Sequence, residues 1–307
     1  MSGQGTMLGR ANLEAAFIAF STVFDMKLKN TPVLYPELSL VIPGVSERLE
    51  FKWLGSIPVM KRWIGERTMQ KLRAESQALE TDWWANGIEI DTDDFIVEAK
   101  LGMLAARVRS LATAAYRRMD DQVTQYYLSG FGTTLGTTYD GAALFSNSHT
   151  AGTGAGVRPG EAQSNLVVGG LTSQTFNAAL QKSMLWLDDE GEPVAQPMKT
   201  VLCGAVNQLT VRQVFKADRN TAGATNLDFG MADPIIAPRF GLSTAWMLLS
   251  PEEIKSVICG VQFDPQFAAA DDPSSPEMFK RRSAMYGAHV KFGLCYGPWQ
   301  TAVGSQG

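Results

Sequence analysis

The sequence predicts an α+β fold, with helices early and in the middle of the chain and an antiparallel sheet in the last part. Three observations favour this class. Apolar residues recur every three or four positions over residues 93–129, which is typical of one long helix. A shorter helical pattern covers residues 172–187. Short apolar runs separated by turn residues fill residues 234–303, which is typical of β-strands.

The first element is an amphipathic helix over residues 11–28, because Leu13, Phe17, Phe20 and Phe24 fall on one face. The stretch that follows, "KNTPVLYPELSLVIPG", holds three prolines, which favour an extended path over a long helix. A single helix and an extended run do not make an independent domain. We therefore expect an N-terminal arm that could lie on a neighbouring molecule.

A basic segment is followed directly by an acidic one. From Lys52 to Arg73 the charged residues are cationic except for Glu66, and from Glu75 to Glu98 all of them are acidic. One interpretation is a hairpin whose two strands pair their charges within the chain. The other is that each segment meets opposite charges on further copies of the chain, which would fix their register. The two interpretations are compatible.

The long helix is predicted from Asp93 to Ser129. Thr92, Asp93 and Asp94 supply an N-cap and negative charge where the helix dipole favours it, and Gly130 ends the pattern. Roughly 35 residues at about 1.5 Å each give about 50 Å. Small residues on the apolar stripe, without sustained heptad leucines, favour a spine on which a sheet packs over a coiled coil.

The remainder alternates polar loops with short elements. Residues 130–165 are rich in Gly, Ser and Thr and predict a long exposed loop, with one apolar piece at Ala142–Phe145. After the capped helix at 172–187, "MKTVLCGAV" predicts a buried strand and "NQLTVRQVF" a helix. A second polar loop then precedes the late strands.

No residues predict catalysis, a cofactor or a metal. His149 stands beside Ser146 and Ser148 with Asp140 upstream, which suggests a serine hydrolase, but the strand–GxSxG–helix elbow is missing. Two histidines and three scattered cysteines do not form a zinc motif. A formal charge of −4 argues against a dedicated nucleic-acid binder. We expect a cytosolic product with reduced cysteines, no signal peptide and no membrane span.

Four segments carry a family resemblance. They cover residues 35–72, 91–130, 138–150 and 286–303, and they include the run W-L-G-x-x-P-x-x-x-x-W-x-G-E-R at 53–67 and the run Y-D-G-x-x-L-F-x-x-x-H at 139–149. In this order they resemble the Mu-like phage major head subunit (gpT-like) family.

The resemblance implies the Hong Kong 97-type fold of tailed-phage major capsid proteins. It implies an N-terminal arm (1–45), an extended two-stranded loop (46–92), a peripheral domain with the spine helix (93–165), an axial domain (166–240), and C-terminal strands returning to the peripheral domain (241–307). It also implies hexamers and pentamers that close into an icosahedral head around double-stranded DNA, bound without sequence specificity. A fused scaffolding segment is not expected, so either a separate scaffolding protein is a partner or the chain has already been trimmed. The other expected partners are a portal and a decoration protein, and the expected location is the virion.

Contacts between subunits are expected in and beside the extended loop, because aromatic residues and arginine are enriched at interface hot spots. The candidates are Trp53, Trp63, Arg62, Arg67, Lys71, Asp82, Glu89 and Asp93. The alternative functions are an encapsulin-type compartment that packages a protein cargo, and a hydrolase that uses Ser146 or Ser148 with His149.

Overall fold

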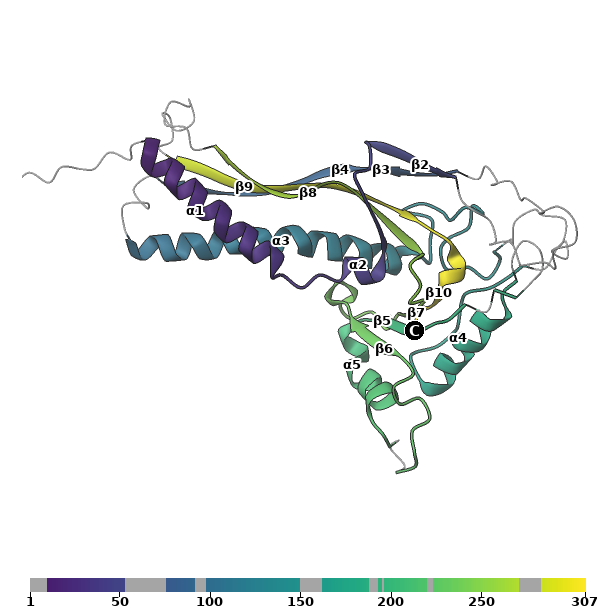
Figure 1. Cartoon of the computed structure of the whole chain (residues 1–307). Helices are drawn as coiled ribbons and strands as arrows, with labels where there is room; N and C mark the ends of the chain where they lie inside the picture. The colour runs from purple at the N-terminus through teal and green to yellow at the C-terminus, as the bar shows by residue number, and fades with distance from the viewer. Residues whose placement is uncertain are drawn as a thin grey trace, which may run out of the picture.

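The computed structural model describes residues 10–52, 76–91, 98–149, 162–187, 193–194, 196–219, 223–270 and 283–307. Its elements form a long flat layer of strands with helices beneath it, and a second, wedge-shaped body attached at one end (Figure 1). Of the predicted contact residues, Trp53, Arg62, Trp63, Arg67, Lys71 and Asp93 lie outside these ranges.

The long layer is a four-stranded sheet in the order β1-β8-β9-β4. Its strands are β1 (Leu40–Pro43), β4 (Asp82–Asp91), β8 (Val257–Ala270) and β9 (Ser283–Tyr296). β8 and β9 pair antiparallel along most of their length, β4 adds ten antiparallel residues at one edge, and β1 joins β8 in parallel. Residues 271–282 lie outside the described ranges, so the connection from β8 to β9 is not described.

The predicted spine is helix α3 (Glu98–Ser129), which runs along one face of this sheet (Figure 1). Its 32 residues span about 48 Å at about 1.5 Å each. Every described member of the predicted stripe from position 104 to position 123 is buried: Leu104, Val108, Leu111, Ala115, Met119 and Val123. The stripe prediction is therefore confirmed, whereas the capping residues 92–94 lie outside the described part of the chain.

The N-terminal helix α1 (Arg10–Lys29) packs against its own chain. The Phe20 ring meets Tyr286 of β9 edge to face with centroids 5.4 Å apart, and Phe17 and Phe24 contact Phe267 of β8 at 5.8 and 5.3 Å. Burial of aromatic rings against α3 and the sheet fixes this helix without a neighbour. The short α2 (Tyr35–Leu38) follows, and the Asp120 carboxylate of α3 accepts hydrogen bonds from the Leu34 and Tyr35 amides at 2.9 and 2.7 Å.

Two strands form the base of the predicted extended loop. β2 (Arg48–Lys52) and β3 (Ser76–Glu80) pair antiparallel, and an Arg48–Glu80 contact of 3.4 Å joins them across the register. Only Thr81 separates β3 from β4, and its hydroxyl donates to Gln262 of β8 at 3.0 Å. Residues 82–91, placed in the loop by the sequence, are instead the edge strand of the main sheet.

The second body holds a four-stranded sheet in the order β10-β7-β5-β6. Its strands are β5 (Thr200–Cys203), β6 (Asp233–Ile236), β7 (Trp246–Leu249) and β10 (Ala302–Ser305). Around it lie α4 (Ser173–Leu185), η2 (Ala205–Asn207), α5 (Gln208–Val211), η3 (Arg212–Lys216), η4 (Pro238–Phe240) and η5 (Trp299–Thr301). The predicted capped helix is confirmed, because Thr172 and Thr175 form a reciprocal capping box at the start of α4.

Two expectations about the late strands are wrong. They do not form one antiparallel sheet, because β7 and β10 pair in the second sheet while β8 and β9 pair in the first. β5 and β6 are also parallel, since the helical turns between them form the crossover that parallel strands require. Residues 246–249 and 302–305 therefore belong with the second body, although the sequence placed 241–307 with the first.

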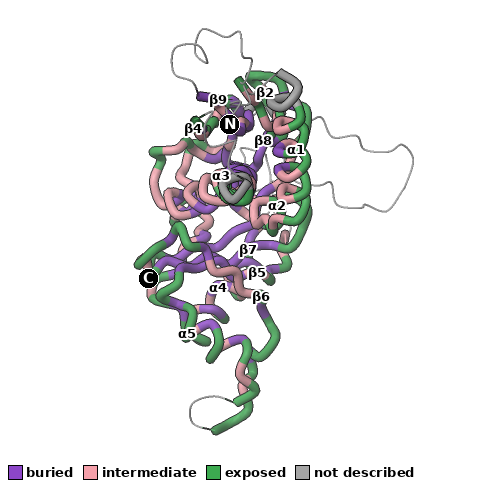
Figure 2. The backbone as a smooth tube through the Cα atoms, turned by 90° about the vertical axis from the view of Figure 1, so that its left-hand side faces the viewer, coloured by how far each residue is buried: buried purple, intermediate pink, exposed green. Residues whose placement is uncertain are grey.

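The largest of four buried clusters includes residues of both bodies, among them Tyr127 of α3 and Trp246 of β7. Figure 2 shows buried backbone from α3 through β8 to β5 and β7, while the outer side of α1 and the tip beyond α5 are exposed. Cys203, Cys259 and Cys295 are free and buried. No described helix combines the length and apolar character needed to cross a membrane.

Candidate functional site

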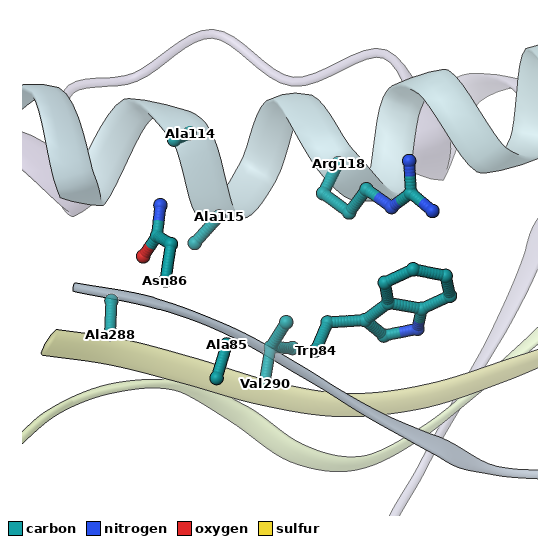
Figure 3. Close-up of a pocket in the computed structure, with 8 residues that line it drawn as sticks. All are labelled: Trp84, Ala85, Asn86, Ala114, Ala115, Arg118, Ala288 and Val290. Atoms are coloured by element: carbon teal, nitrogen blue, oxygen red, sulfur yellow. The ribbon is translucent and has the colours of Figure 1, made fainter.

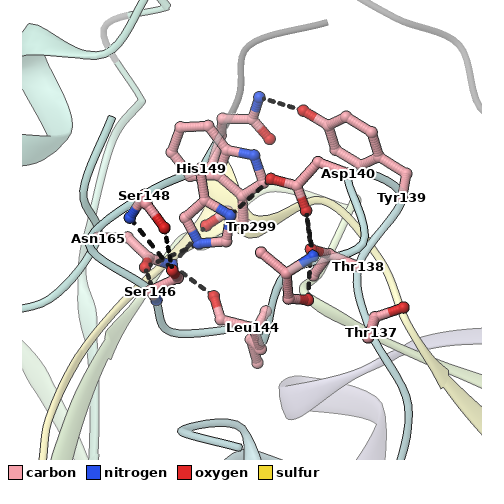
Figure 4. Close-up of polar contacts among 12 residues, drawn as sticks. Thr137, Thr138, Tyr139, Asp140, Leu144, Ser146, Ser148, His149, Asn165 and Trp299 are labelled. Atoms are coloured by element: carbon pink, nitrogen blue, oxygen red, sulfur yellow. Dashed lines mark hydrogen bonds and ion pairs between the residues drawn. The ribbon is translucent and has the colours of Figure 1, made fainter. Parts of the chain in front are cut away.

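A buried polar cluster lies where the loop after α3 meets the C-terminal end of the chain (Figure 4). It consists of Asp140, His149, Asn165 and Trp299, which we call the junction cluster. His149 and Asn165 are fully buried, and so is Trp299. The cluster brings three segments together: the Y-D-G-x-x-L-F-x-x-x-H run, the approach to α4, and the turn between β9 and β10.

His149 is held on three sides. Its Nδ1 lies 2.8 Å from Oδ2 of Asp140, its Nε2 lies 3.1 Å from Oδ1 of Asn165, and its ring stacks on Trp299 with centroids 4.4 Å apart and planes 5° from parallel. Both ring nitrogens therefore face an oxygen of a neighbouring side chain inside the core.

Asn165 fixes the orientation of this arrangement. Its Nδ2 donates to the carbonyl oxygens of Leu144 at 2.7 Å and Ala302 at 3.1 Å, which leaves Oδ1 as the acceptor for His149. The Ser146 amide donates to the same Oδ1 at 2.9 Å. Sequence reasoning missed Asn165, because an isolated asparagine in a polar stretch carries no distinguishing pattern.

The carboxylate of Asp140 accepts several hydrogen bonds besides that of His149. The Thr138 hydroxyl and the Ala142 amide, at 3.1 Å for the amide, both donate to Oδ1. Burial opposes ionisation of Asp140, but the hydrogen bonds and charge of His149, with those from Thr138 and Ala142, outweigh it. The pKa of Asp140 is therefore held below its usual value.

The serine-hydrolase alternative is contradicted by this geometry. The Ser146 and Ser148 hydroxyls lie 3.4 Å from each other, whereas both nitrogens of His149 are engaged by Asp140 and Asn165. His149 therefore has no free nitrogen with which to activate either serine as a nucleophile. The expectation of an exposed loop is also wrong here, because the polar side chains satisfy one another and allow Leu144 and Phe145 to be buried.

The C-terminal strand β10 packs against the junction cluster and the segment before α4. The Val167 amide donates to the Gly304 carbonyl and the Gly304 amide to the Asn165 carbonyl, both at 2.9 Å. A Cβ at Gly304 would lie 2.6 Å from the Phe145 ring, so only glycine allows this close approach. Trp186 at the end of α4 meets Trp299 edge to face at 5.4 Å. These buried contacts connect the two bodies.

A second feature lies between the spine helix and the edge of the main sheet (Figure 3). The Arg118 guanidinium stands over the Trp84 ring at 3.9 Å, beside a pocket of about 230 Å³ lined largely by alanine and valine. This volume is below the roughly 300–1,000 Å³ of typical ligand pockets. The contact fastens α3 to β4, and we assign no ligand to it.

Of the predicted contact residues, Asp82 and Glu89 are described, and they lie on β4, where Asp82 is exposed. The Ser283 hydroxyl donates to Glu89. In the described ranges, no group of three or more His, Cys, Asp and Glu side chains is placed to hold a metal ion.

The comparison with known families decides where this chain belongs. The sequence model of the family "Mu-like prophage major head subunit gpT" matches residues 13–170 and 239–307, which include all four members of the junction cluster. The chain belongs to this family.

Two curated relatives agree with the gpT family. The Mu-like prophage FluMu major head subunit of Haemophilus influenzae is 29% identical over 140 residues, covering 46% of this chain and 44% of that protein. The major capsid protein of Escherichia phage Mu is 25% identical over 152 residues, covering 48% of each. The chain thus aligns with about half the length of the curated relatives it matches.

A solved structure shows the same fold. A chain of the procapsid of bacteriophage JBD30 is similar with a TM-score of 0.62 and 19% identity, covering 97% of this chain and 76% of that one. The Hong Kong 97-type fold implied by the sequence is therefore confirmed. The matching family is one of major head subunits.

Proposed function

We propose that this chain is the major head subunit of a tailed double-stranded DNA phage, and that it assembles as hexamers and pentamers into an icosahedral shell around the genome. The observation that carries the proposal is the gpT family match over both ends of the chain. The Hong Kong 97-type fold supports it, because its flat sheet layer and wedge-shaped second body give each subunit several separate faces for contacts with other copies.

In this proposal the two bodies are the peripheral domain and the axial domain of the subunit. The peripheral domain comprises α1, α3 and the sheet β1-β8-β9-β4, and the axial domain comprises α4 and the sheet β10-β7-β5-β6. The junction cluster sets the angle between them. A fixed angle supports assembly, because a subunit that bends freely at this point would lose conformational entropy on joining a shell.

The extended loop is the proposed contact with a neighbouring subunit. Trp53, Trp63 and Arg67 would serve as its anchors, and Arg62 and Lys71 would pair with Asp82, Glu89 or Asp93 of another copy. The position of Asp82 and Glu89 on the edge strand β4 supports this arrangement, because an edge strand can be approached from outside the chain. A separate scaffolding protein, a portal and a decoration protein are further proposed partners.

Sizing and electron microscopy of the purified protein test the proposal. The expected result is capsomers or megadalton closed particles, and a monomer under all conditions of concentration and salt would contradict it. The contents of the particles separate two kinds of shell. Nucleic acid supports a phage head, whereas a co-purified protein cargo without nucleic acid would support the encapsulin-type compartment.

Charge reversal tests the loop contacts. Arg67→Glu is expected to leave the subunit folded and soluble and to abolish closed particles. Lys71→Glu is expected to reduce particle yield, and adding Glu89→Lys to restore it if these two residues pair between subunits. Normal heads from Arg67→Glu would refute the anchor, and the absence of rescue would refute this particular pair.

A further inference from the structure

Three cations line one pocket on the helix layer of the peripheral domain. Lys27 near the end of α1 faces Arg109 and Arg117 of α3 across a hollow of about 300 Å³, whose other lining residues are Ser110, Thr113 and Ala114. Arg109 and Arg117 are exposed, and Lys27 is partly exposed. The two arginines are eight positions apart, so they lie about 12 Å from each other along the helix axis.

These cations are not neutralised within the described chain. No ion pair in the described ranges joins Lys27, Arg109 or Arg117 to an acid, although Asp25 and Asp121 are close in sequence. The C-terminal end of the α1 dipole favours Lys27 alone. Like charges that face one hollow repel each other, so the site is suited to an external anion.

Two carboxylates of β4 lie on the opposite face of the same domain. Ile88 and Ile90 of β4 pack toward α1 and α3, and alternation along the strand directs Glu89 and Asp91 to the far side of the sheet. Both carboxylates lie on the strand at the sheet edge. The three pocket cations and these two carboxylates therefore lie on opposite sides of the main sheet, and the helix layer also carries Asp25 and Asp121.

We propose that the pocket of Lys27, Arg109 and Arg117 binds backbone phosphates of double-stranded DNA, so that the helix layer faces the packaged genome. This inference rests on the proposed head function and assigns its inner face. Phosphate is favoured over an acidic protein segment because the described lining offers only Ala114 as an apolar residue, and protein interfaces need an apolar or aromatic centre.

The site carries no means to read bases among its described residues. The Ser110 and Thr113 hydroxyls donate to the carbonyl oxygens of Ala106 and Arg109, both at 3.1 Å, so the cations provide the donors that remain. Contacts of this kind are independent of sequence and strongly dependent on salt.

The test measures binding of the purified, unassembled full chain to fluorescein-labelled double-stranded DNA of random sequence by anisotropy, over a range of salt concentrations. The variant is Lys27→Gln/Arg109→Gln/Arg117→Gln. For wild type we expect log affinity to fall with log salt. For the variant we expect a slope shallower by up to about 2.7, or about 0.9 for each phosphate that is no longer neutralised.

A control of equal charge makes the result specific. Arg212→Gln/Lys216→Gln/Arg219→Gln removes three cations from the axial domain and changes net charge equally. It is expected to retain the wild-type slope. Equal slopes for wild type and the pocket variant, or slopes reduced equally in both variants, would overturn the proposal. Circular dichroism and the urea midpoint check that both variants remain folded.

A second arm separates DNA from an acidic protein partner. Poly-glutamate that binds wild type more tightly than the DNA, with the same dependence on the three cations, would assign the pocket to an acidic protein segment and overturn the DNA assignment. Because binding is measured without assembly, the result does not depend on head formation. If heads form normally but the pocket variant keeps the wild-type salt slope, this inference alone is refuted. If the chain never assembles, the proposed head function alone is refuted.

Discussion

The imidazole of His149 lies flat on the indole of Trp299, with the ring centroids 4.4 Å apart and the planes 5° from parallel. These residues are far apart in sequence, and their contact joins the loop after the spine helix to the turn that leads into β10. The Asp140 carboxylate holds the far edge of the same imidazole. One stacked ring pair thus joins the Y-D-G-x-x-L-F-x-x-x-H run to the turn that leads into β10.

Removing the imidazole should destabilise the subunit strongly. His149→Ala would leave the Asp140 carboxylate, whose side chain is 2% exposed, without its main partner. We expect the free energy of unfolding to fall by about 3 kcal/mol, measured by urea denaturation. The matched control is His289→Ala, which removes the other histidine from the open sheet face and should cost less than about 1 kcal/mol. Equal effects of the two variants would contradict a role for the junction cluster.

The stability that Asp140 contributes should depend on pH in the acid range. Its pKa is lowered in the folded chain, so the contribution is fully present above the unfolded value of about 3.9 and is lost as pH falls through the lower folded value. The urea midpoint of wild type should therefore fall toward that of Asp140→Asn as the pH drops below about 4. A constant gap between the two proteins across this range would contradict the assignment.

Alanine at Gly304 should strain the junction. Its Cβ would meet three atoms of the Phe145 ring within 2.9 Å, and we expect a loss of about 1–3 kcal/mol. Adding Phe145→Leu, which shortens the opposing side chain, should recover part of the loss. Gly170→Ala is the control, since no atom lies within 4 Å of a Cβ at that position. A neutral Gly304→Ala would show that the ring moves aside freely.

The three thiols should be unreactive in the folded subunit. Burial raises the pKa of Cys203 to about 11 and of Cys259 and Cys295 to about 12, so the thiolate is scarce at mildly alkaline pH and reagents lack access to it. A thiol-reactive chromogenic disulfide should label none of them in native buffer and all three in guanidinium chloride. Rapid labelling of the native protein would contradict the packing of β5, β8 and β9.

Local patterns predicted the local elements well. The stripe of α3 follows from three- and four-residue spacing, because a helix against a sheet must bury one continuous face. Thr172 identified the start of α4 because a hydroxyl before a helical pattern satisfies free amides of the first turn. The buried run at 200–203 identified β5 because both faces of that strand are covered.

Non-local pairing was the limit of prediction. Nothing in the composition of residues 246–249 or 302–305 assigns them to one sheet or the other, because assignment depends on partners far away in the chain. The parallel pairing of β5 and β6 could have been predicted, because a strand–helix–strand order favours parallel strands. The length of β8 was hidden by the polar and small residues of its second half, where one face remains exposed.

The junction cluster was the largest omission of the sequence prediction. A stretch rich in Gly, Ser and Thr predicts exposure on average, but that average fails where polar groups satisfy each other inside the fold. The available signals were Leu144 and Phe145, which need burial, and the pairing of Asp140 with His149 nine positions later. Neither signal identifies Asn165 or Trp299 as the remaining members.

Only Thr81 separates β3, in the base of the predicted extended loop, from β4 in the main sheet, so the two strands are tightly coupled. The Thr81 hydroxyl donates to Gln262 of β8, and the Thr81 amide donates to the carbonyl of Glu47, which stands opposite it just before β2. A displacement of the β2–β3 hairpin would therefore reach β8 through Thr81. In the proposed shell, a neighbour that moves this hairpin would transmit strain directly to the main sheet.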